Sequence, residues 1–189
     1  TTGGVYCLNI DKKELTHPIQ KGNITSFYQD SEGELWIGSW EEGLFRVKAD
    51  GAIKNFKYNA KNPHSLSSNF VRACCEDNLG NIWIGTFNGL NRYNKITGLF
   101  QNHTASDTQA DGLTHSSIWC IVKDNQGTLW LGTYFGGVNY FNPEYEIYTR
   151  YSYSSNEKKG LSNPVVGRTI EDKDGNLWIG TEGGGLNYY

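Results

Sequence analysis

The chain has 189 residues, a formal net charge of −3 and 37% hydrophobic residues, which is the size of one domain or of part of a larger one. It contains 23 glycines and 14% aromatic residues, a composition that favours short strands and tight turns over helices. The sequence has no apolar run of membrane-spanning length and no basic excess, so we expect no direct membrane insertion and no nucleic-acid partner.

The chain consists of repeats with a period of about 47 residues. Each repeat has an Asp, a Gly three residues later, and then an apolar–Trp–apolar–Gly run followed by Ser or Thr. After a short loop comes a Gly and another apolar residue. A copy of this last part also opens the chain, at residues 3–6. The repeated tryptophans are Trp36, Trp83, Trp130 and Trp178.

Each period predicts a four-stranded antiparallel sheet. The first strands are predicted at 24–29, 71–76, 118–123 and 166–171, where apolar residues on both faces indicate burial on both sides. The second strand carries the tryptophan, and the third begins at the Gly–apolar pair. The fourth strands are predicted at 53–58, 99–103 and 147–151.

Four strands per period with one repeated aromatic residue predict an all-β fold made of β-propeller blades. We expect about four blades. Their boundaries are a blade remnant at 1–20, blades at 21–60, 66–105 and 114–153, and a partial blade at 162–189.

Three residues of the repeat have predicted structural roles. The Asp caps the turn after the first strand, and the Gly three residues later takes a positive φ. The repeated tryptophan is expected to fill the space between neighbouring sheets as core. The glycines after it are expected to permit a bulge or a close approach of another strand; they are Gly38, Gly85, Gly132 and Gly180.

The pattern Glu/Lys-Asp-x-x-Gly-Asn-Leu-Trp-Ile-Gly-Thr-x-x-Gly-Gly-Leu-Asn-x-Tyr, clearest at 76–93 and 171–188, resembles the two-component regulator propeller repeat. The resemblance implies the periplasmic sensor region of a bacterial hybrid two-component system. Such regions have two seven-bladed propellers, an immunoglobulin-like module and a membrane helix, followed by histidine kinase and response-regulator parts. Family members sense oligosaccharides. The resemblance therefore implies a periplasmic segment with an oligosaccharide ligand.

A seven-bladed ring would need about 330 residues, and the chain does not begin with Met. We therefore expect a processed or excised segment that forms an arc of a larger propeller. Its partners would be the remaining blades and the kinase parts of the same protein. Alternatively, exposed blade edges would meet another copy in a homodimer.

Four candidate ligand-binding residues lie at one position of the repeat, four residues after each tryptophan: Trp40, Phe87, Tyr134 and Glu182. This position is on the loop between the second and third strands, and loops on a rigid scaffold commonly carry function. The three aromatic residues suit stacking on sugar rings, and the alternative is packing over the blade edge.

Three further candidates, Arg72, Trp119 and Arg168, interrupt first strands near the propeller axis. An arginine there suits an anionic group such as a uronate or a sulfate. The alternative is an ion pair with a carboxylate of a neighbouring blade.

The cysteines and the loop histidines have no metal-ligand spacing, so we expect no metal and no cofactor. The four cysteines are interpreted as small apolar core residues. They are Cys7, Cys74, Cys75 and Cys120, and the loop histidines are His64, His103 and His115.

We consider three functions. The first is a non-catalytic sensor segment that binds an oligosaccharide or relays its recognition. The second is a protein-interaction or dimerisation scaffold. The third is a propeller lyase or glycoside hydrolase, which the sequence disfavours because the first strands offer arginines but no inward carboxylate or histidine. We therefore predict no catalytic residues in this segment.

Overall fold

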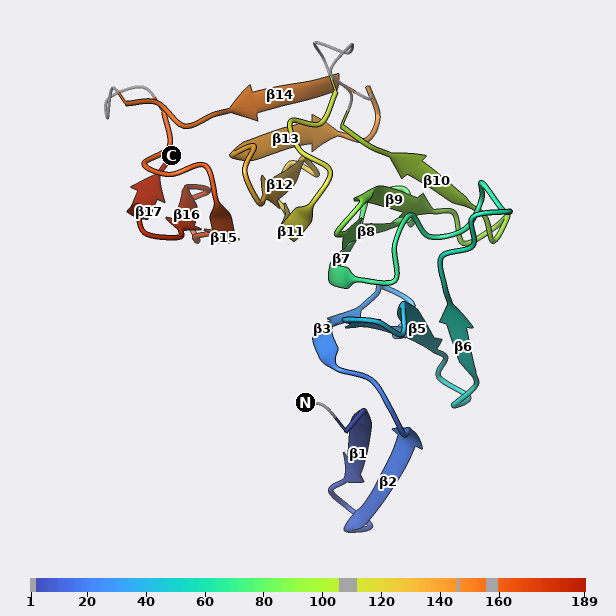
Figure 1. Cartoon of the computed structure of the whole chain (residues 1–189). Coiled ribbons are helices and arrows are strands. Elements are labelled where there is room, and N and C mark those ends of the chain that lie inside the picture. The colour runs from blue at the N-terminus through green and yellow to red at the C-terminus, as the bar shows by residue number, and fades with distance from the viewer. Residues whose placement is uncertain (1–2, 106–111, 146, 156–159) are drawn as a thin grey trace.

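The computed structural model describes residues 3–105, 112–145, 147–155 and 160–189. All the described secondary structure is β-strand, arranged in five antiparallel sheets that follow one another along an open arc (Figure 1). The first strand of each complete or partial blade lies on the concave side of this arc. The predicted all-β propeller fold is therefore confirmed.

Each sheet is ordered as in the chain, so that every strand pairs with its neighbours in sequence. The hairpin that opens the chain comprises β1 (Val5–Asn9) and β2 (Glu14–Ile19). The next blade comprises β3 (Ile24–Gln29), β4 (Leu35–Ser39), β5 (Leu44–Val47) and β6 (Ile53–Phe56). The second four-stranded blade comprises β7 (Val71–Glu76), β8 (Ile82–Thr86), β9 (Gly89–Tyr93) and β10 (Phe100–His103).

The third four-stranded blade and a three-stranded sheet complete the arc. The blade comprises β11 (Ile118–Lys123), β12 (Leu129–Thr133), β13 (Val138–Asn142) and β14 (Ile147–Tyr151). The last sheet comprises β15 (Val166–Glu171), β16 (Leu177–Thr181) and β17 (Gly185–Tyr188).

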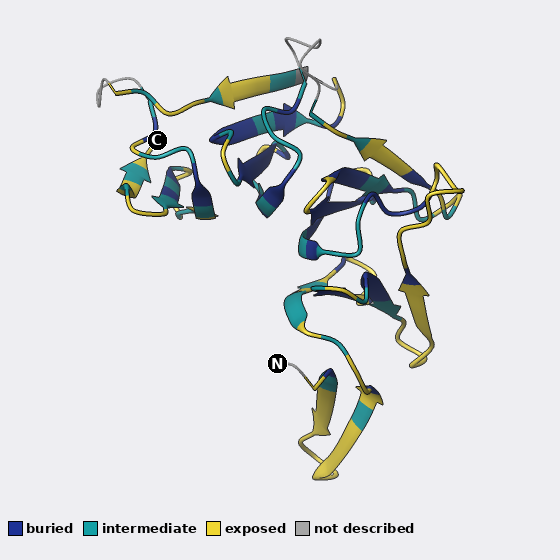
Figure 2. Cartoon of the chain, viewed as in Figure 1, coloured by how far each residue is buried: buried dark blue, intermediate teal, exposed yellow. Residues whose placement is uncertain are grey.

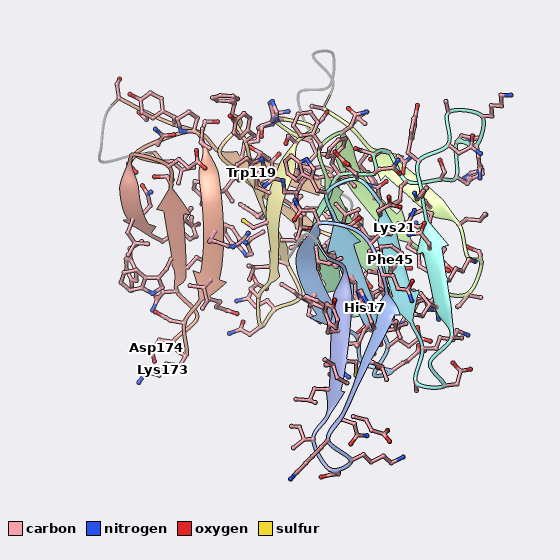
Figure 3. All side chains as sticks on the ribbon, turned by 60° about the horizontal axis from the view of Figure 1, so that its bottom comes forward. His17, Lys21, Phe45, Trp119, Lys173 and Asp174 are labelled. Atoms are coloured by element: carbon pink, nitrogen blue, oxygen red, sulfur yellow. The ribbon has the colours of Figure 1, made fainter. Side chains whose placement is uncertain are left out.

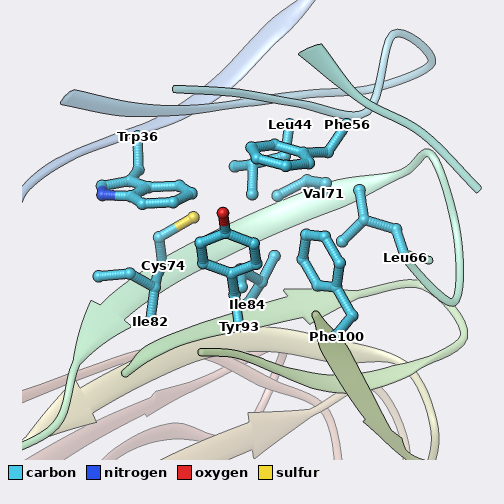
Figure 4. Close-up of a cluster of buried hydrophobic side chains, with 10 residues drawn as sticks. All are labelled: Trp36, Leu44, Phe56, Leu66, Val71, Cys74, Ile82, Ile84, Tyr93 and Phe100. Carbon is cyan, nitrogen blue, oxygen red and sulfur yellow. The ribbon is translucent and has the colours of Figure 1, made fainter. Parts of the chain in front are cut away.

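The core lies between blades, where the tryptophan of one blade packs on the next. Figure 4 shows the cluster between the first two four-stranded blades, in which Trp36 and Leu44 face Cys74 and Tyr93. The rings of Trp36 and Tyr93 are 5.3 Å apart. Because aromatic rings bury a large apolar area, this interface provides much of the attraction between adjacent sheets.

The glycine after each of the first three tryptophans provides room for the next blade. A Cβ atom on Gly85 would lie 2.8 Å from Cγ2 of Ile118, and one on Gly132 would lie 2.7 Å from Cγ1 of Val166. Opposite each of these glycines the first strand of the same blade has a register shift. The repeat glycines thus allow both the bulge and the close approach that the sequence suggested.

The expectation that every first strand is buried on both faces is wrong for the first and the last blade of the arc. Phe27 of β3 is 62% exposed and Ile170 of β15 is 65% exposed. Full burial requires a blade on either side. Within the described residues, the blade of β3 is preceded only by the β1–β2 hairpin, and no further sheet follows the one that contains β15. Figure 2 shows the buried residues concentrated in the middle blades.

The cysteines also differ from one another. Cys74, Cys75 and Cys120 are buried, as expected of small core residues, but Cys7 is exposed, and all four thiols are free. Cys7 lies on β1, whose sheet has only two strands, so this hairpin lacks the layers that would cover it.

Candidate functional site

The loops between second and third strands are held beside the start of the first strand of their own blade. In each blade the backbone N–H four residues after the repeat tryptophan donates to the carbonyl oxygen just before the first strand. These bonds join Trp40 to Asn23, Phe87 to Phe70, Tyr134 to Ser117 and Glu182 to Val165. The four predicted loop residues therefore lie on the same face of the arc, where the first strands begin. Figure 3 shows Trp119 on this face, away from the β15–β16 turn that carries Lys173 and Asp174.

Arg72 and Trp119 project from the bulges of β7 and β11. Each is the second residue of its first strand, at the point where the register shifts opposite Gly85 or Gly132. A bulge removes one residue from the regular ladder and re-aims its side chain. The bulge next to the repeat glycine is therefore what turns these two side chains toward the loops.

Four side chains from three blades form a continuous stack, which we call the aromatic–arginine stack: Trp40, Arg72, Trp119 and Tyr134. The Arg72 guanidinium carbon lies 4.4 Å from the ring centroid of Trp40 and 4.2 Å from that of Trp119. The rings of Trp119 and Tyr134 are stacked, with centroids 5.0 Å apart and planes 14° apart. Cation–π attraction to two indoles at once holds the Arg72 guanidinium beside Trp40 and Trp119.

The charge of Arg72 has no counterion within the described residues. Its side chain makes no ion pair or hydrogen bond there, and its buried Nε has no acceptor. Burial lowers the pKa of Arg72 and the charge of Arg168 lowers it further, while Glu182 and Tyr134 act in the opposite direction. The expected alternative, an ion pair with a carboxylate of a neighbouring blade, is not formed in the described structure.

The other predicted residues lie around this stack without joining it. Phe87 is 54% exposed, and its ring is 6.1 Å from that of Phe70, which in turn lies 5.3 Å from Trp40. Arg168 and Glu182 are exposed and act on Arg72 only through their charges.

Sequence reasoning missed two aromatic contributors. Phe70 contacts Trp40 and Phe87, and His115 lies 6.4 Å from Tyr134 and 6.2 Å from Phe135. Both belong to the connectors that lead into first strands. Aligning these connectors at the same period as the tryptophans would have placed them beside the loop residues.

Three of the four cysteines are buried, and burial governs the protonation of their thiols. Burial raises the pKa of Cys75 to about 11 and raises those of Cys74 and Cys120 as well, so these thiols are protonated near neutral pH. Among the described residues no three His, Cys, Asp or Glu side chains gather around one point as metal ligands would. The same residues contain no helix with the length and apolarity needed to cross a bilayer.

Comparison with known proteins relates the chain to a repeat family. Residues 18–41, 65–88, 112–135 and 160–183 each match the sequence pattern described as two component regulator propeller, and together they make up just over half of the chain. A search of curated proteins found no match.

Among solved structures, the extracellular domain of a hybrid two component system from B. thetaiotaomicron is 27% identical, with a TM-score of 0.74 over 98% of this chain and 23% of that one. A second such domain from the same organism is 22% identical, with a TM-score of 0.76 over 100% of this chain and 25% of that one. Virginiamycin B lyase from Staphylococcus aureus is 15% identical, with a TM-score of 0.71 over 100% of this chain and 63% of that one. The last two show similarity of fold alone. The chain spans about a quarter of the length of the two sensor domains.

Proposed function

Because the chain belongs to the two-component regulator propeller family, we propose that it is a non-catalytic part of the sensor region of a hybrid two-component system. It takes part in recognising an oligosaccharide outside the cytoplasm, in the periplasm, and the signal passes to kinase parts of the same protein. The similarity to extracellular domains of hybrid two-component systems supports this location and role.

The aromatic–arginine stack is the single observation that carries the ligand part of the proposal. Aromatic faces with a few polar groups at their edges are typical of small-ligand sites. Tyr134 lies at the end of the stack and provides such a face, while Trp119 lies between Arg72 and Tyr134 and contributes its indole Nε1, which has no acceptor in the described structure. The residues come from three blades, so an occupied site would connect the blades to one another.

The test is calorimetric titration of the intact protein with a panel of oligosaccharides. We expect saturable binding of at least one glycan, and a loss of at least tenfold in affinity on Tyr134→Ala, because one face of the stack is removed. Tyr58→Ala serves as the matched control, since Tyr58 is an exposed tyrosine that follows the outer strand β6. Saturable binding of another ligand class with no response to any glycan would refute the proposal.

A second candidate function is a protein-interaction or dimerisation scaffold. The exposed faces of β3 and β15, with Phe27 and Ile170 largely uncovered, favour it. On that function Trp40, Phe87 and Tyr134 could be replaced by alanine without altering signalling. Sedimentation of the intact protein together with a signalling assay of these variants separates the two functions.

The fold is also found in an enzyme, virginiamycin B lyase. Incubating the intact protein with the same glycans and following new reducing ends tests for catalysis. We expect no turnover, and turnover that is lost on a substitution in the stack would replace the sensor proposal with an enzymatic one.

A further inference from the structure

One position of the repeat lies at the bulge of each first strand, and we call its occupant the bulge residue. In each blade with a first strand, the pairing with the second strand shifts register across this residue. The bulge residues are Thr25, Arg72, Trp119 and Gly167. The last blade therefore offers backbone alone at a position where the other three blades present a side chain.

Arg72 shows what a bulge residue reaches. Its guanidinium carbon lies 4.4 Å from the ring centroid of Trp40, a loop residue of the preceding blade. The equivalent loop residue before the last blade is Tyr134, because both lie four residues after a repeat tryptophan. The bulge residue that follows Tyr134 is Gly167, which has no side chain to extend over the ring. The place that Arg72 fills on Trp40 thus stays open on Tyr134.

The fold itself does not require a glycine at this bulge. A Cβ atom on Gly167 would meet nothing closer than the carbonyl oxygen of Gly180, at 3.7 Å, and the φ of Gly167 is not positive. The open place lies between Tyr134 and β15, which belong to neighbouring described blades. It is therefore distinct from the outer face of the last sheet, where Leu186 is exposed.

A carboxylate flanks the open place. In the third four-stranded blade the loop residue Tyr134 stacks on its own bulge residue Trp119, with ring centroids 5.0 Å apart. The equivalent pair in the last blade is Glu182 and Gly167, and the backbone N–H of Glu182 donates to the carbonyl oxygen of Val165. The Glu182 side chain is exposed and makes no ion pair or hydrogen bond with a described residue. An aromatic face and an ionisable oxygen acceptor thus border one place.

We propose that one sugar ring of the oligosaccharide binds in this place, with its apolar C–H face on Tyr134 and its hydroxyl groups donating to the Glu182 carboxylate. Small-ligand sites combine aromatic surfaces with a few polar groups that fix the orientation of the ligand. Hydrogen bonds to an ionised carboxylate are stronger than those between neutral groups. The inference rests on the proposed function and adds that Gly167 admits the ring, and that the ring carries free hydroxyl groups.

The experiment fills the place from the protein side. Gly167→Trp and Gly167→Arg are titrated by calorimetry, as the intact protein, with neutral tetrasaccharides of glucose, galactose, mannose and xylose. We expect each substitution to weaken binding at least tenfold, because the new side chain lies on Tyr134 as Arg72 lies on Trp40. Gly167→Ala is the matched control and should bind within about twofold of the unmodified protein, because a methyl group is too short to cover the ring.

A second variant tests the carboxylate. Glu182→Ala should weaken binding at least threefold, and fully O-methylated forms of the same tetrasaccharides should not bind, because they have no hydroxyl group to donate. Thermal unfolding of every variant reports whether the fold persists. Since Gly167 is partly exposed and Glu182 is exposed, all the variants should unfold at the temperature of the unmodified protein.

The outcomes separate this inference from the proposed function. Undiminished binding by folded Gly167→Trp or Gly167→Arg protein overturns the inference and leaves oligosaccharide sensing intact. An equal loss in Gly167→Ala also overturns it, because the loss then comes from the backbone and not from a filled place. Unchanged affinity in Glu182→Ala, or binding of the methylated sugars, overturns the role of the carboxylate. Binding of no saccharide by the unmodified protein overturns both proposals.

Discussion

At the scale of single residues, one hydrogen bond recurs in all four repeats. The carboxylate oxygen Oδ2 of the turn aspartate accepts the indole N–H of the repeat tryptophan, at 2.7 Å between Asp77 and Trp83. The other carboxylate oxygen, Oδ1, accepts backbone N–H groups of the turn. The equivalent indole bonds join Asp30 to Trp36, Asp124 to Trp130 and Asp172 to Trp178. The aspartate thus links the turn to the core tryptophan.

Replacing this aspartate should therefore cost more than the loss of a turn cap. Asp77→Ala leaves the indole N–H of Trp83, which is fully buried, without an acceptor, and an orphaned buried donor costs about 1–3 kcal/mol. Urea unfolding of the variant measures the loss. Asp174→Ala, in the exposed turn after β15, should change stability little. Equal effects of the two substitutions would show that the indole bond does not contribute.

At the scale of elements, adjacent blades depend on the glycine that follows each tryptophan. Gly85→Ala would place a methyl group 2.8 Å from Cγ2 of Ile118 in the next blade, so the two sheets must separate. Overpacking of this kind costs about 1–3 kcal/mol. Gly167→Ala is the control, because a Cβ atom there meets nothing closer than 3.7 Å. The two variants are compared by denaturant unfolding, and equal stability would mean that the blades adjust freely.

A partly buried ion cluster joins the first two four-stranded blades on the face of the arc opposite the aromatic–arginine stack. The Nζ atom of Lys95 lies 3.2 Å from Asp30, 3.1 Å from Glu32 and 2.8 Å from Glu76. Glu76 also accepts the backbone N–H and the hydroxyl of Ser31. Asp30, Glu32 and Ser31 belong to one blade, and Lys95 and Glu76 belong to the next, so the cluster closes the seam between them.

This cluster predicts a loss of stability in acid. Burial raises the pKa values of Asp30 and Glu76, but hydrogen bonds outweigh burial and both pKa values end below their ordinary level. The main bonds come from Trp36 to Asp30 and from Lys95 to Glu76. A carboxyl group with a lowered pKa stabilises the fold above its unfolded pKa, near 4, and loses this contribution as the pH falls through its folded pKa.

Lys95→Met tests the cluster directly. Breaking a buried ion pair by removing one partner costs about 3 kcal/mol at neutral pH, and the difference from the unmodified protein should shrink as the pH falls below about 4. Thermal unfolding of both proteins across this pH range measures it. A difference that stays constant with pH would show that the carboxylates do not depend on Lys95.

At the scale of the whole molecule, the last sheet exposes positions that are buried in the other blades. Leu186 of β17 is 64% exposed, whereas Leu90 and Val138 at the same place in the repeat are fully buried. A Cβ atom on Gly180 would meet only the carbonyl oxygen of Arg168, at 3.7 Å and in its own blade, whereas one on Gly85 or Gly132 would meet the next blade. We propose that a further blade of the same repeat covers this face in the intact protein, with a β-branched residue over Gly180.

Gly180→Ala in the intact protein tests this arrangement. If a further blade covers the glycine, the substitution should cost about 1–3 kcal/mol, as expected for Gly85→Ala. Unfolding of the two variants, measured side by side, gives the answer. A neutral Gly180→Ala would mean that this face is open to solvent in the intact protein.

The sequence was sufficient for the parts of the structure that follow from local pattern. Alternating strand and turn residues located the first strands at their observed bounds, and the period of the tryptophans gave the blade as the unit. The aspartate and glycine of the turn also followed from local backbone preferences. The indole bond of the aspartate did not, because a side chain six residues away is brought to it only by the pairing of two strands.

The candidate site was predicted as a set of residues but not as an arrangement. Position in the repeat singled out Trp40 and Tyr134 as aromatic residues on the loop after the second strand, and Arg72 and Trp119 as interruptions of the first strands. It could not tell that Arg72 lies between two indoles from other blades, or that Phe87 remains outside the stack. Those contacts depend on the bulges and on the angle between neighbouring sheets.

The sequence by itself determined the repeat, the blade and the all-β class, because each follows from side-chain periodicity within 47 residues. Only the tertiary structure decided which charges are paired. Lys95 contacts three carboxylates on one face of the arc, whereas Arg72 on the other face contacts none among the described residues. The physical reason is that ion pairing depends on distances between blades, and these are set by packing between sheets far apart in the chain.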